Sequence, residues 1–67
     1  MVNKKKLYSI MYDKGFDKME LVNMLSMAES TYYRKINGEA EFKVSDIDEF
    51  IKILNLTPNE VNDIFFS

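Results

Sequence analysis

Residues 21–38 read LVNMLSMAESTYYRKING, and this stretch decides the expected fold. Leu21, Val22 and Leu25 share one face of a predicted helix, and Ser26-Met27-Ala28 forms a turn. A second short helix over Glu29–Ile36 follows and ends at Asn-Gly. A helix that shows hydrogen-bonding and cationic side chains to solvent, braced from behind by another helix, has the geometry that enters a DNA major groove.

The residues before this stretch predict a first helix from about Lys4 to Lys14. Asn3 can cap its start, and Gly15 suits the left-handed position that commonly follows a helix end. The apolar residues of this helix fall three and four positions apart: Leu7, Ile10 and Met11. Three lysines in its first turn oppose the helix dipole. They form either a solvated helix end or a phosphate-contacting arm.

Capping patterns predict where two other helices begin. Asp17 and Glu20 have capping-box spacing at the start of the second helix, which contains Leu21. Residues 57–60, TPNE, place threonine at the cap, proline at the first helical position and glutamate at the third. Inward-facing Val61, Ile64 and Phe65 would follow in the fifth helix.

The region between these helices predicts a loop over residues 39–44 and then a fourth helix capped by Ser45. Phe42 and Val44 should turn from the loop into the core. The apolar stripe of the fourth helix would be Ile47, Phe50, Ile51 and Leu54. Because no segment alternates apolar and polar residues as a strand does, the sequence predicts an all-α fold of five short helices.

Length and composition place the chain, residues 1–67, in one small domain. It has no cysteine and no histidine, so we expect no metal site, no cofactor, no small-molecule ligand and no enzyme activity. No apolar run approaches the roughly 20 residues that span a bilayer, and no signal peptide is recognisable. We therefore expect a cytoplasmic protein without a membrane partner.

Charge is distributed unevenly along the chain. Residues 1–38 carry seven basic and four acidic residues, a net charge of +3, whereas residues 39–67 carry two basic and seven acidic residues, a net charge of −5. Such polarity suits a protein that turns one face toward phosphates. It also predicts weak binding per monomer, because few cations are available to release counterions from DNA.

From about Leu7 to Phe66 the chain resembles the lambda-repressor-like, Cro-type (XRE-family) helix-turn-helix fold of phage and prophage regulators. The residues that carry the resemblance are GFDK at 15–18, LVxxLSM at 21–27, STYYRKING at 30–38, Phe42, and LNLTPxEV at 54–61, with IFF at 64–66 as the ending. The resemblance implies a compact five-helix DNA-binding domain. Its helix-turn-helix would span about 17–37, with residues 29–36 as the recognition helix.

By position, the resemblance also implies the site residues. Base edges would be met by Glu29, Ser30, Thr31, Tyr33 and Arg34, and the DNA backbone by Lys18, Lys35, Asn37 and Lys43. Arginine can donate two hydrogen bonds to guanine. The sequence departs from the family where Ala28 replaces a capping residue, and where Glu29 stands in place of a neutral or basic residue.

The expected partner is double-stranded DNA with a palindromic operator, bound by a homodimer that forms either in solution or only on DNA. Of Phe65 and Phe66, one should close the core and the other is a possible dimer contact. The alternative is a helical protein–protein module, an anti-repressor or assembly factor, that kept the fold without binding DNA. Its acidic second half or its Phe65-Phe66 end would then bind the partner.

Overall fold

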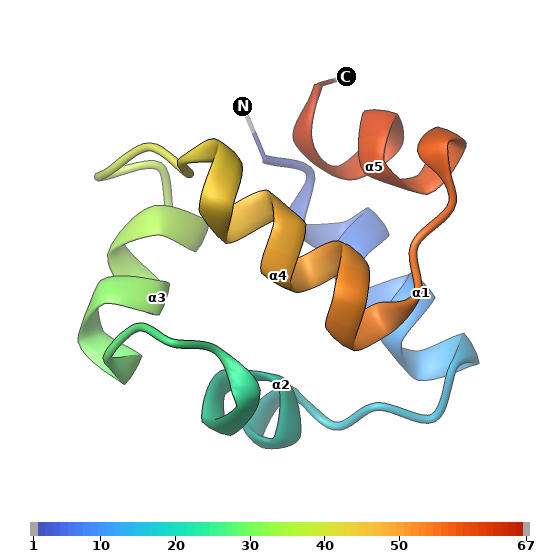
Figure 1. Ribbon diagram of the computed structural model, residues 1–67, viewed down its shortest axis with the longest axis horizontal. Coiled ribbons are helices and arrows are strands. Elements are labelled where there is room, and N and C mark those ends of the chain that lie inside the picture. Colours follow the sequence, from blue (N-terminus) through green and yellow to red (C-terminus); the bar gives the residue numbers. More distant parts are fainter. Residues whose placement is uncertain (1, 67) are drawn as a thin grey trace.

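Five helices form the part of the chain that the computed structural model describes, residues 2–66 (Figure 1). They are α1 (Lys4–Asp13), α2 (Lys18–Met24), α3 (Glu29–Ile36), α4 (Val44–Leu54) and α5 (Pro58–Phe65). Residues 2–66 contain no strand, which confirms the all-α prediction. α1 packs against α5, α2 packs against α3, and α4 crosses the middle of the view in Figure 1. None of the helices in this range is long and apolar enough to cross a membrane.

The core is built from the apolar stripes of all five helices. Tyr32 and Phe50 are its largest fully buried side chains. Fully burying one aliphatic or aromatic side chain contributes roughly 1.5–3 kcal/mol, so the core supplies most of the driving force for folding. The buried hydrophobic residues are Leu7, Ile10, Met11, Leu21, Val22, Leu25, Tyr32, Ile36, Phe50, Leu54, Leu56, Ile64 and Phe65.

Three phenylalanines hold the loop after α3 and the end of α5 onto α4. The rings of Phe42, Phe50 and Phe65 lie edge to face, with each pair of ring centroids 5.4 Å apart. Such pairs contribute about 0.5–1.5 kcal/mol each beyond their burial. Phe65, which is 6% exposed, is therefore the phenylalanine that closes the core. Phe66, with 66% of its surface exposed, lies at the surface.

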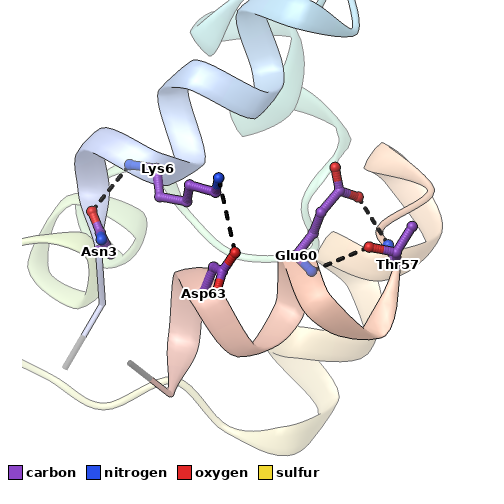
Figure 2. Close-up of polar contacts among 5 residues, drawn as sticks. All are labelled: Asn3, Lys6, Thr57, Glu60 and Asp63. Atoms are coloured by element: carbon purple, nitrogen blue, oxygen red, sulfur yellow. Dashed lines mark hydrogen bonds and ion pairs between the residues drawn. The ribbon is translucent and has the colours of Figure 1, made fainter.

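The helix starts that capping patterns predicted are present. Asn3 Oδ1 accepts a hydrogen bond from the Lys6 N–H at the start of α1. The Asp17 N–H donates to Glu20 Oε1 at the start of α2. Before α5, Glu60 Oε1 accepts from the Thr57 N–H at 2.9 Å, and Thr57 Oγ1 accepts from the Glu60 N–H at 3.2 Å (Figure 2). Gly15 follows α1 with φ at +78°, as its left-handed position requires.

The predicted start of α4 was wrong in two respects. Lys43, rather than Ser45, is the residue that precedes the helix, and its N–H donates to Asp46 Oδ2 at 2.8 Å. Val44 is not in the core: it is the first helical residue and is 77% exposed. Both errors have one physical cause, because Asp46 also binds Lys35 of α3, and this tertiary contact favours the earlier helix start.

Candidate nucleic-acid interface

The connection between α2 and α3 places the two helices against each other. Leu21, Val22 and Leu25 are buried behind it. The four-residue connection is extended at Leu25 and at Ala28, so the chain leaves one helix and enters the next without a shared helical turn. The Ser26 N–H donates to Glu49 Oε1 of α4 at 2.8 Å. A side chain from α4 therefore supports this connection from outside the segment.

The inner face of α3 is fixed in the core. Tyr32 and Ile36 are buried, as predicted. The hydroxyl of Tyr32 lies 3.1 Å from the hydroxyl of Tyr8 on α1, so the only polar group on this face has a partner. Burial, together with the hydrogen bond to Tyr8, raises the pKa of Tyr32, and its hydroxyl stays neutral. α3 is thus held against α1 as well as against α2.

The outer face of α3 carries the five residues expected to meet base edges. Glu29, Ser30 and Arg34 are exposed, whereas Thr31 and Tyr33 are half-buried. Arg34 also has its backbone carbonyl engaged, because it accepts from Glu39 N–H at 2.8 Å and Ala40 N–H at 3.2 Å. The exposed guanidinium is therefore attached to a backbone that the following turn restrains.

Lys18 connects the start of α2 to this face. Its ammonium lies 5.5 Å from the centroid of the Tyr33 ring, within the range of a cation–π contact. The Tyr33 ring in turn meets Tyr32 edge to face, with centroids 5.2 Å apart. A cation predicted to meet phosphate and an aromatic ring predicted to meet bases thus lie side by side, although they come from different helices.

Lys35 does not face outward. Its ammonium forms an ion pair with Asp46 Oδ2 at 2.5 Å, and only 11% of its side chain is exposed. Burial alone would raise the pKa of Asp46, but the hydrogen bonds from Lys35 and from the Lys43 N–H lower it below its ordinary value. Lys35 therefore ties α3 to the start of α4. Its predicted contact with the DNA backbone is not compatible with this pairing.

The C-terminal end of α3 lies beside the start of α1. Asn37 is exposed and ends the helix. Its Oδ1 accepts a hydrogen bond from the ammonium of Lys4, the first residue of α1, at 2.9 Å. Lys43 is exposed at the start of α4. Of the four residues expected at the DNA backbone, Lys18, Asn37 and Lys43 are exposed and Lys35 is not.

An open groove lies between the loop after α3 and the end of α5. It has a volume of about 420 Å³, and its apolar lining residues are Val2, Ala40, Phe42, Ile47, Phe65 and Phe66. Lys35 and Glu41 contribute polar groups. Exposed Phe66 thus stands at the edge of an apolar groove. Within residues 2–66, no three acidic side chains are arranged to hold a metal ion.

The sequence did not identify the supporting roles of Asp46 and Glu49. The spacing of Lys43 and Asp46 was a usable signal, since an acidic residue three positions after a cap can accept the N–H of the cap. Ser45 and Asp48 have the same spacing, so the local pattern could not choose between them. No local signal pointed to Glu49, because its partner, the Ser26 N–H, lies 23 residues away.

No protein-family model, no curated protein and no solved structure matches this chain.

Proposed function

We propose that the protein is a sequence-specific DNA-binding regulator of the phage or prophage type, with α2 and α3 as its helix-turn-helix and α3 in the major groove. The observation that carries the proposal is the exposed guanidinium of Arg34 on a helix whose opposite face, Tyr32 and Ile36, is buried. A short helix with one buried face and one cationic, hydrogen-bonding face suits base readout. Lys18, on the neighbouring helix, supplies a cation suited to a phosphate.

The proposed binding form is a homodimer on a palindromic operator. Two recognition helices one helical turn of DNA apart would enter successive major grooves. Phe66 is the proposed dimer contact, because it is exposed and lies beside the apolar groove between the α3–α4 loop and α5. A single exposed phenylalanine covers only a small part of the ~800 Å² that each partner buries in a stable complex. We therefore expect the dimer to be weak without DNA.

The substitution Arg34→Ala tests the assignment of α3. The preferred duplex is first obtained by selection from a random pool, and affinity is then measured by fluorescence anisotropy. Loss of a bidentate contact to guanine costs roughly 1–3 kcal/mol, so affinity should fall about 5- to 150-fold while the thermal unfolding midpoint stays unchanged. Lys52→Ala, which removes an exposed cation from α4, serves as the matched control and should change affinity little. Equal affinities of Arg34→Ala and the wild-type protein would remove α3 from the interface.

A second candidate function is a protein–protein module that binds no DNA. The net charge of −5 over residues 39–67 and the apolar groove beside Phe66 favour it. Salt dependence separates the two candidates. A DNA binder loses affinity for generic duplex steeply as salt is added, whereas the module would bind no duplex even at low salt.

A further inference from the structure

Lys4, rather than Lys35, carries an exposed ammonium beside the end of α3. The Lys35 ammonium is paired with Asp46 and largely buried. The Lys4 ammonium instead lies 2.9 Å from Asn37 Oδ1, and both residues are exposed. A residue from the start of α1 thus reaches the end of a helix that lies 33 positions away in sequence.

The backbone that carries Lys4 is fixed in place. The Asn3 side chain caps α1 by accepting from the Lys6 N–H, and the Asn3 N–H donates to the carbonyl of Ile64 in α5 at 2.6 Å. These bonds attach the start of α1 to the end of α5. The backbone that precedes Lys4 is therefore tied to both α1 and α5.

The neighbouring lysine on the same helix turn points elsewhere. The Lys6 ammonium lies 3.8 Å from Asp63 Oδ2 of α5 (Figure 2). Lys4 and Lys6 are two residues apart, so their side chains leave the helix in different directions. One positive charge therefore faces the end of α3 and the other faces an acidic residue of α5.

The chemistry at the end of α3 suits a phosphate only when Lys4 is present. The C-terminal end of a helix carries a partial negative charge that repels anions, and an ammonium beside it offsets that charge. A lysine ammonium has three donors, and the bond to Asn37 uses one of them. Because Asn37 accepts through Oδ1, its side-chain NH₂ keeps two donors. Both groups can then donate to one phosphate.

We infer that Lys4 and Asn37 form a phosphate-binding site for the DNA backbone at the C-terminal end of α3. This inference rests on the proposed function, because its ligand is a backbone phosphate of the duplex that α3 reads. With Lys18 at the start of α2, this site places cations at two separate points around the outer face of α3. Contacts of this kind set the register of a reading helix on DNA without selecting bases.

The test compares Lys4→Gln with Lys6→Gln, two substitutions that remove the same charge from the same helix turn. Affinity for a generic mixed-sequence duplex is measured by anisotropy over a series of NaCl concentrations. Each lost phosphate contact lowers the salt slope by about 0.9. Lys4→Gln should lower the slope by about that amount and weaken binding about three- to tenfold at low salt. Lys6→Gln should leave the slope close to that of the wild-type protein.

Two additional variants separate binding from folding. Lys4→Arg keeps the charge and should keep the salt slope, and Asn37→Asp replaces the two donors with an acceptor and should weaken binding. Circular dichroism checks that each variant is helical and melts as the wild-type protein does. Equal slopes for Lys4→Gln and Lys6→Gln would overturn the inference while leaving the proposed function intact. Absence of duplex binding by the wild-type protein at low salt would overturn both.

Discussion

The helices α3 and α5 are both eight residues long, but they begin in different ways. α5 begins with Thr57, whose hydroxyl accepts from the Glu60 N–H, while the Glu60 carboxylate accepts from the Thr57 N–H. α3 begins with Ala28, which has no side-chain oxygen to cap the helix. α3 is instead held by contacts from α4, through the Glu49–Ser26 hydrogen bond and the Lys35–Asp46 ion pair. The start of α5 is thus stabilised by a cap in its own sequence, whereas α3 lacks such a cap and is held by side chains of α4.

The largest expected loss of stability comes from removing the ion pair between Lys35 of α3 and Asp46 of α4. Asp46→Ala removes the acceptor for both the Lys35 ammonium and the Lys43 N–H, and it leaves a largely buried ammonium unpaired. Breaking a fully buried pair costs about 3–5 kcal/mol, and because this pair is partly exposed we expect a loss of about 2–3 kcal/mol. Urea unfolding followed by circular dichroism measures the difference. Asp48→Ala on the same helix is the control and should stay within about 0.5 kcal/mol of the wild-type protein.

The contribution of Asp46 to the free energy of unfolding should depend on pH. Its pKa is lower in the folded protein than the ordinary value of 3.8, so unfolding takes up protons as pH falls through this region. The stabilisation that the Asp46 carboxylate supplies is complete above its ordinary pKa, and it is lost as pH drops through the lower pKa of the folded protein. The difference between wild-type protein and Asp46→Ala should therefore be full at about pH 6 and narrow below about pH 4. A difference that stays constant over this range would show that the carboxylate charge is not what holds α3.

A smaller loss of stability is expected from removing the cap of α5. Thr57→Ala removes the hydroxyl that accepts from the Glu60 N–H and should lower the free energy of unfolding by about 1 kcal/mol. Thr57→Ser keeps the hydroxyl and serves as the control, with nearly wild-type stability. If Thr57→Ala cost more than Asp46→Ala, the contrast between a locally capped α5 and a tertiary-supported α3 would be wrong.

The same contrast explains how much the sequence could predict. Capping pairs three residues apart and apolar residues three and four apart are local signals, and they located α1, α2, α3 and α5 to within a residue or two. The core roles of Tyr32 and Ile36 followed from the same spacing. Where the Lys35–Asp46 and Ser26–Glu49 contacts decide the outcome, the prediction was wrong or missing. Lys35 was expected to face outward, but an aspartate 11 positions later holds it inward.

In the candidate site, too, helical spacing predicted some positions, whereas long-range packing decided others. The outward positions of Glu29, Ser30 and Arg34 follow from helical spacing, and the structure places all three at the surface. The position of Lys4 beside Asn37 depends on how α1 packs against α5 and α3, which no pattern within ten or fifteen residues encodes. That α3 binds DNA remains a prediction, since the exposure of a cationic face is compatible with other partners.

The smallest expected effect is a gain from supplying α3 with the cap that it lacks. Ala28 already has the extended backbone of an N-cap residue, with φ at −66° and ψ at 152°. Ala28→Ser should therefore stabilise the protein by about 0.5–1 kcal/mol, measured by urea unfolding, without moving the helix. Ala40→Ser, the same substitution in the loop after α3, should change little. Equal effects of the two substitutions would mean that the contacts from α4 already satisfy the start of α3. In that case the contacts from α4 would stabilise the start of α3 as much as a capping side chain does.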